Sequence, residues 1–91
     1  MAKYYFHTED GQCFPDEDGI ELSGIEEAKS TAVEVLVEAL KGKPEVIWHT
    51  GDWRVIVTDE ANLIQFQIQV MVVSSPATPP SALPRRTTAG T

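Results

Sequence analysis

Residues 53–73 read Trp-Arg-Val-Ile-Val-Thr-Asp-Glu-Ala-Asn-Leu-Ile-Gln-Phe-Gln-Ile-Gln-Val-Met-Val-Val, and this stretch decides the fold. In its second half, apolar side chains alternate with glutamines, which is the period of a strand with one apolar and one solvated face. An antiparallel sheet with one wet face produces this pattern, whereas a central strand of a parallel sheet is apolar on both faces. The apolar face carries Ile64, Phe66, Ile68, Val70 and Val72, and the opposite face carries Gln65, Gln67 and Gln69.

The first half of the same stretch predicts the partner strand of a hairpin. Trp53, Val55 and Val57 share one face, and Arg54, Ile56 and Thr58 share the other. The connection 59–62 favours a type I turn followed by a bulge. Its Asp59 can hydrogen-bond its own backbone, and its Asn62 tolerates the left-handed conformation that this turn requires.

The N-terminal part of the chain predicts further strands separated by turns. Residues 3–8 read as a strand with Tyr4 and Phe6 on one face, and residues 12–14 as a short returning strand. The stretches 9–11 and 16–19 are glycine-containing acidic turns, and residues 20–22 form an extended segment that leads to a helix.

A single helix is predicted to begin at Ser23, because Ser23 and Glu26 have the spacing of a capping box. Lys41 falls in its last turn, Gly42 can cap it, and Pro44 prevents its continuation. Residues 45–51 form a connector whose middle is either a short strand or a packed loop. One stripe of the helix is apolar and comprises Ile25, Ala28, Ala32, Val35, Leu36, Ala39 and Leu40.

These elements together predict an α+β fold, with an antiparallel sheet of three to four strands and one helix packed on its apolar face, in the order β-β-α-β-β. Residues 1–75 form this single domain. Residues 76–91 are rich in proline and threonine and almost without large apolar side chains, so we expect them to be a disordered tail.

The chain resembles a family of short bacterial proteins, common in alphaproteobacteria, that is classed as a domain of unknown function. Asn62 stands where the family usually has glycine, and the connector around Trp48 departs from the family pattern. The resemblance covers about residues 3–73 and implies the fold and a bacterial source, but no activity. Its matching pieces are Tyr4–His7, Asp10–Gly11, Asp16–Leu22, the helix with Ala28 and Ala32, and Trp53–Asn62.

Composition argues against several classes of function. The formal net charge of -7 is the opposite of the basic surface that a phosphate backbone requires, so we expect no nucleic-acid partner. No apolar run approaches the roughly 20 residues of a membrane span, and the N-terminus lacks the plan of a secretory signal, so we expect a cytoplasmic protein with no membrane partner. The single cysteine, Cys13, rules out an internal disulfide framework.

Candidate chemical groups are few, and each has a simpler interpretation. His7 and His49 could meet an acid from 16–18 in a metal site, but exposed or edge-strand histidines are the default. Cys13 beside a histidine could act as a nucleophile, but a small buried thiol next to Phe14 is favoured. In 16–19 the glycine comes too early for a calcium loop. We therefore expect no enzyme and no catalytic, cofactor or metal residues.

The leading hypothesis is a non-enzymatic protein-interaction or regulatory module that self-associates as a homo-oligomer. The last strand is long for so small a domain, and sheet edges can pair with another chain. One alternative is a small-ligand or stress-related binding protein with a pocket near Trp48, Trp53 and His7; another is an antitoxin-like acidic partner of a basic protein; a third is a small hydrolase or transferase. The candidate interaction surface comprises Val33, Val37, Trp48, His49, Gln65, Gln67 and Gln69.

Overall fold

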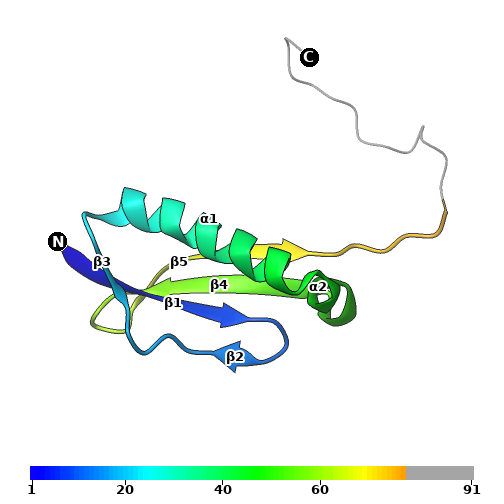
Figure 1. Ribbon diagram of the computed structural model, residues 1–91, viewed down its shortest axis with the longest axis horizontal. Helices are drawn as coiled ribbons and strands as arrows, with labels where there is room; N and C mark the ends of the chain where they lie inside the picture. Colours follow the sequence, from blue (N-terminus) through cyan, green and yellow to red (C-terminus); the bar gives the residue numbers. More distant parts are fainter. Residues whose placement is uncertain (78–91) are drawn as a thin grey trace, which may run out of the picture.

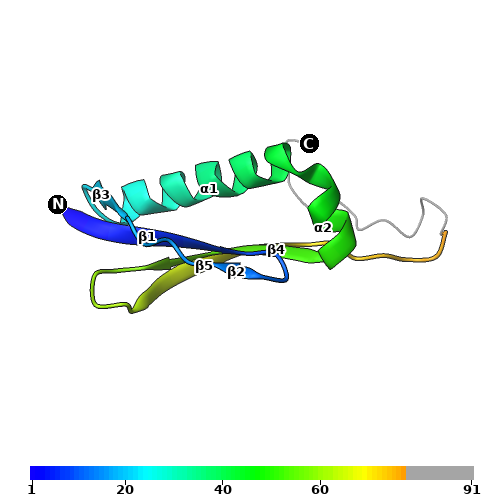
Figure 2. The same ribbon diagram turned by 60° about the horizontal axis from the view of Figure 1, so that its bottom comes forward.

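The computed structural model describes residues 1–77, which form an antiparallel sheet with one long helix across one of its faces (Figures 1 and 2). A second, short helix lies at the end of the sheet where the chain enters the hairpin. The α+β fold class is confirmed, with one strand and one helix more than predicted. The predicted tail lies outside the described residues except for Pro76 and Ala77. The elements are β1 (Ala2–Glu9), β2 (Cys13–Phe14), β3 (Ile20–Leu22), α1 (Ile25–Gly42), α2 (Pro44–Thr50), β4 (Asp52–Thr58) and β5 (Ile64–Met71).

The strand order is β2-β1-β4-β5. Along the same edge of β1, β2 pairs with its C-terminal end and β3 pairs with its N-terminal end. The N-terminal strand β1 therefore lies beside β4, and both are central. In the antiparallel register Phe6 lies opposite Val57, and Val57 in turn lies opposite Phe66. Apolar side chains thus form continuous rows across three strands on the face that α1 covers.

The core lies between α1 and the β1–β4 pair. Ala28 and Ala32 have no exposed surface, and their small side chains let the helix approach the sheet closely. Val55 and Val57 beneath them are also completely buried. The remaining buried apolar residues are Tyr4, Phe6, Leu22, Leu36, Ile47 and Trp53.

The hairpin of β4 and β5 has the predicted turn. Asn62 has a φ of 64°, and the Asp59 carboxylate accepts hydrogen bonds from the backbone N–H groups of Ala61 and Leu63 at 2.9 and 3.0 Å. Val57 lies opposite Phe66 and Thr58 opposite Ile64, so Gln65 is an extra residue that forms a further bulge in β5, beyond the turn.

The strand that decided the fold class is an edge strand, and α1 covers it only in part. Phe66, Ile68 and Val70 are half-buried because the helix lies over β4 and β1. The prediction that α1 covers the whole apolar row is wrong for Ile64, which is 58% exposed beside the bulge. Ile25 was predicted to belong to the apolar stripe of the helix, but it lies in the first turn and is 37% exposed.

The predicted capping box is wrong in its residues. Gly24, not Ser23, occupies the N-cap position and α1 begins at Ile25, so the third helical position belongs to Glu27. The Glu27 carboxylate accepts a hydrogen bond of 2.7 Å from the Ser23 backbone N–H, and this bond lowers the pKa of Glu27. Glu26 instead forms an exposed ion pair of 3.2 Å with Lys29.

Residues 45–51, predicted as a strand or loop, belong largely to α2. Pro44 does end α1, but it also occupies the first turn of the next helix, where its missing N–H costs no hydrogen bond. Gly51 has a φ of 89° and ends α2 in the left-handed conformation. The three consecutive residues Val46–Trp48 favour strands locally, and burial of Ile47 against the core outweighs that preference.

The thiol of Cys13 is exposed, so the prediction of a buried thiol is wrong. Its neighbour Phe14 is 51% exposed. The two-residue strand β2 lies at the margin of the sheet, where α1 does not cover it. Neither helix of residues 1–77 combines the length and the apolar character needed to cross a membrane.

Candidate functional site

The outer edge of β1 is closed by three different devices. Backbone groups of successive residues in a strand point to opposite sides, and in β1 those of Tyr4, Phe6 and Thr8 point away from β4. Tyr4 pairs with β3 and Thr8 pairs with β2. Phe6 lies in the gap between them, and its N–H donates to Oδ2 of Asp16 at 3.1 Å. One carboxylate therefore replaces a missing strand residue.

The outer edge of β5 has no such cover within residues 1–77. The Val72 N–H donates to the Gly51 carbonyl at 2.8 Å, which fixes the direction of the backbone groups along the strand. By alternation, the backbone N–H and carbonyl groups of Ile68 also point toward β4, while those of Gln67 and Gln69 point outward. Among residues 1–77 these outward groups have no strand partner, so they can form a further ladder of hydrogen bonds.

Nothing in the sequence of β5 hinders the addition of a strand. Its residues, Ile-Gln-Phe-Gln-Ile-Gln-Val-Met, include no charge and no proline. Natural proteins commonly block an exposed edge with lysine, proline or a very short strand. The opposite side of the sheet follows that rule, since β2 and β3 have only two and three residues.

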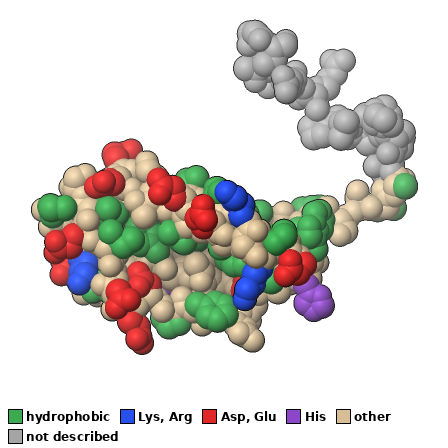
Figure 3. Space-filling model, in the orientation of Figure 1, with side chains coloured by type: hydrophobic (Ala, Val, Ile, Leu, Met, Phe, Trp, Pro, Cys, Tyr) green, Lys and Arg blue, Asp and Glu red, His purple; other side chains and the backbone are tan. Residues whose placement is uncertain are grey.

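An apolar flank of α1 lies on the same side of the molecule as β5. Glu38 lines a pocket together with Phe14, so this part of the helix faces β2. At about 100° per residue, Val33 and Val37 lie roughly 140° and 100° around the helix from Glu38, away from β2. They are 51% and 44% exposed. Figure 3 shows hydrophobic side chains at the surface over α1, among acidic ones.

The seven residues predicted as an interaction surface do not form one patch. The three glutamines lie on the sheet face away from α1, and the two valines lie on α1 itself. Trp48, 74% exposed, and His49 lie on α2, whose end adjoins the last residues of β5 through the Gly51–Val72 hydrogen bond. Of these groups, only the three glutamines belong to β5 itself.

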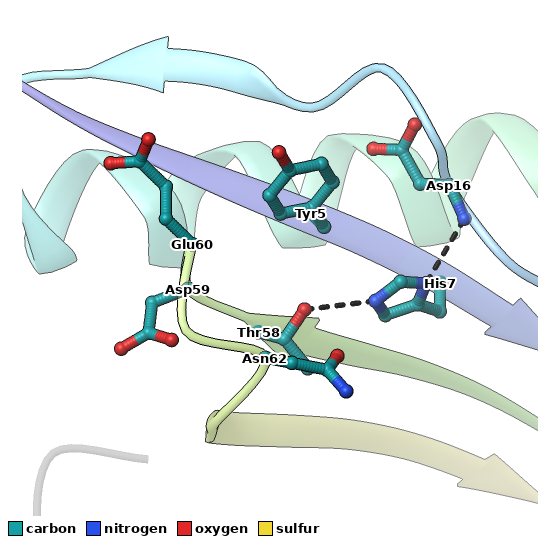
Figure 4. A pocket seen from close by; sticks show the side chains of 7 residues that line it. All are labelled: Tyr5, His7, Asp16, Thr58, Asp59, Glu60 and Asn62. Carbon is teal, nitrogen blue, oxygen red and sulfur yellow. Dashed lines mark hydrogen bonds between the residues drawn. The ribbon is translucent and has the colours of Figure 1, made fainter.

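A polar pocket of about 220 Å³ lies on the uncovered sheet face, at the hairpin end (Figure 4). Its centre is His7, whose Nδ1 accepts a hydrogen bond of 3.0 Å from the Asp16 backbone N–H. Nδ1 is therefore unprotonated, and Nε2–H donates to the Thr58 hydroxyl at 2.9 Å. The lining residues are Tyr5, His7, Asp16, Thr58, Asp59, Glu60 and Asn62.

Both ring nitrogens of His7 are thus engaged in holding the 15–19 loop to the sheet. Partial burial acts to raise the pKa of Asp16, but hydrogen bonds from the backbone N–H groups of Phe6, Gly19 and Asp18 outweigh it and lower that pKa. Gly19 has a φ of 72°, and a Cβ there would lie 2.9 Å from the Tyr5 ring. The Asp16 carboxylate and the His7 ring therefore both have structural partners.

The structure does not assemble the combinations of reactive groups considered from the sequence. Within residues 1–77 no three or more His, Cys, Asp and Glu side chains are placed to hold a metal ion. His7 meets Asp16 but not His49, which lies on α2. Trp53 is buried beneath α1, whereas His7 lies on the opposite sheet face, so the ligand pocket imagined between Trp48, Trp53 and His7 does not exist.

The hydrogen-bond network of Asp16 was not predicted from the sequence, because an acidic turn with glycine is typical of a solvated loop. The signal available was the Asp-x-Asp-Gly spacing of residues 16–19, which allows one carboxylate to accept bonds from the backbone two and three residues on. The bond to Phe6 depends on contacts across the fold.

Residues 3–71 match a family model described as Domain of unknown function (DUF6894), which confirms the resemblance to such a domain. The matched residues extend from β1 to the last residue of β5, so they include the sheet except for its first residue, Ala2. No curated protein and no solved structure matches the chain.

Proposed function

The chain belongs to the DUF6894 family, a domain of unknown function, and for this member we propose a non-enzymatic interaction module that self-associates through the free edge of β5. The observation that carries the proposal is the row of outward backbone groups at Gln67, Gln69 and Met71. Strand addition uses such groups for affinity, and the flanking side chains decide which partner fits.

A second copy of the chain is the partner that suits this edge. We consider β5 of one copy paired with β5 of a second copy in antiparallel orientation. Residues that lie opposite each other across such a pair are on the same face of the sheet when their numbers differ by an even amount. The half-buried row of Phe66, Ile68 and Val70 then extends into the same row of the partner. The glutamines of the two copies meet on the other face, where their amides can donate to and accept from each other.

Self-pairing also gives a reason for the valines on α1. In the paired sheet the two β5 strands lie at the centre, where α1 of each copy covers them only in part. Val33 and Val37 are exposed on the flank of α1 that faces away from β2, and we propose that they border this apolar seam from above. Burial of apolar surface there would stabilise the pair at about 25 cal/mol per Å² of area removed from water.

Long-range electrostatics opposes the association, because each copy carries a formal net charge of -7. The strand itself is uncharged, so the repulsion comes from groups elsewhere on the surface. Salt screens such charges over about 10 Å at 0.1 M ionic strength. We therefore expect the dimer to become tighter as salt concentration rises, which is opposite to the behaviour of an interface held by ion pairs.

The test is light scattering coupled to size-exclusion chromatography over a wide range of protein concentration. The unaltered chain should shift from monomer to dimer. Gln67→Pro removes an outward N–H and should abolish the shift, whereas the matched control Gln67→Thr keeps that N–H and should retain it. A chain that stays monomeric at the highest concentration, or a dimer that persists in Gln67→Pro, would overturn the proposal.

A further inference from the structure

Trp53 carries a buried hydrogen-bond donor without an acceptor. Only 6% of this residue is exposed, and its Nε1–H has no partner among the described residues. Tryptophan N–H groups that are buried usually find a partner. This donor is therefore an exception that calls for an explanation.

Trp53 also lines a pocket on the helix side of the sheet, at the end opposite to the polar pocket of Figure 4. The pocket has a volume of about 290 Å³, at the lower limit of typical small-molecule sites. It lies between the last turns of α1 and the β1–β2 turn. Its lining comprises Asp10, Phe14, Glu38, Ala39, Gly42, Lys43 and Trp53.

We propose that this pocket binds a small neutral molecule with an apolar, ring-sized body and one hydrogen-bond acceptor, which the Trp53 indole N–H engages. This site is separate from the β5 edge and does not depend on self-association. Aromatic and aliphatic surface from Trp53, Phe14 and Ala39 would contact the apolar body. Phe14, half exposed at the mouth, would become covered when the molecule binds.

The charges around the pocket argue for a neutral molecule. Asp10 and Glu38 contribute two carboxylates and Lys43 contributes one ammonium, so the rim is negative and disfavours an anion. An ammonium or guanidinium group has no lone pair for the indole donor. A ketone, ester or amide oxygen meets both conditions. The indole nitrogen is buried before the molecule binds, so side chains of the pocket must move for the molecule to reach it. Glu38 and Lys43 line the pocket with long, exposed side chains that have room to do so.

The experiment titrates the protein with acetophenone, which has an aromatic body and a carbonyl, and with ethylbenzene, which has nearly the same shape and no acceptor. Indole N–H resonances are followed in proton–nitrogen correlation spectra, and Trp48→Phe assigns the two signals. We expect acetophenone to move the Trp53 signal downfield saturably, and ethylbenzene to bind about tenfold more weakly or worse, because it leaves the donor unpaired.

Ala39→Leu, which places a larger side chain in the pocket, should weaken acetophenone binding at least tenfold, and the dispersed amide spectrum would show that the fold is intact. The proposal is wrong if the Trp53 signal stays in place, if the two probes bind equally well, or if Ala39→Leu binds acetophenone as tightly as the unaltered chain. Because dimerisation is measured separately, failure here leaves the β5 proposal standing.

Discussion

Two proline substitutions at neighbouring positions of β5 separate the inner from the outer edge of this strand. In Ile68→Pro the lost N–H points toward β4, whereas in Gln67→Pro it points outward. The two residues are adjacent and lie in the middle of β5, so neither substitution disturbs a helix or a turn. The comparison therefore measures what each side of the strand contributes to the folded monomer.

The magnitude follows from what lies opposite each residue. Ile68 pairs with Val55, which is completely buried, so Ile68→Pro leaves the Val55 carbonyl without its donor at a cost of about 1–3 kcal/mol. Loss of half-buried isoleucine surface adds about 1 kcal/mol. We expect Ile68→Pro to lower the free energy of unfolding by about 2–4 kcal/mol. Gln67→Pro loses no ladder bond and should cost less than about 1 kcal/mol.

The assay is urea unfolding followed by far-UV circular dichroism, at protein concentrations low enough to keep the chain monomeric. A domain of this size has about 5 kcal/mol or somewhat more of total stability, so the expected loss in Ile68→Pro is easily resolved. If both prolines destabilise the monomer equally, the assignment of outward groups is refuted, and the proposed mode of self-association loses its basis.

Three further predictions concern the loop of Asp16 and the helix flank. The pKa of Asp16 is lowered on folding, so the ionised carboxylate contributes its full stability above pH 3.8, the ordinary pKa, and this contribution is lost as pH falls through the lower pKa of the folded state. In Asp16→Asn the free energy of unfolding should therefore fall less over this acidic pH range, as urea unfolding at a series of pH values would show. Gly19→Ala should destabilise the fold by about 1–3 kcal/mol in thermal or urea unfolding, because φ is 72° and the new Cβ would collide with the Tyr5 ring; an unchanged midpoint would contradict the close contact. Val37→Glu should raise the dimer dissociation constant at least tenfold in sedimentation analysis, whereas Lys3→Gln, which makes the same change in net charge on the β1–β3 side of the sheet, away from β5, should leave it within about threefold; equal effects would mean that net charge, not position, controls association.

The sequence determined the elements whose signals are local and periodic. The glutamine alternation of 64–70 predicted a strand with one wet face, and the residues Asp59 and Asn62 predicted the turn that the structure has. The apolar stripe that includes Ala28 and Ala32 predicted a helix packed on the sheet, and both alanines are completely buried there. Each of these follows from the geometry of one strand, one turn or one helix, which neighbouring residues are sufficient to specify.

Tertiary structure decided which strand is central and which is exposed. The sequence of β5 does not specify that β1 lies beside β4, and that arrangement leaves the edge of Gln67 and Gln69 without a neighbouring strand in the described part of the chain. The same is true of the bond from Phe6 to Asp16, of α2 and of the unpartnered Trp53 donor. Each depends on which distant segments meet in space, and the period of a single segment carries no information about its neighbours.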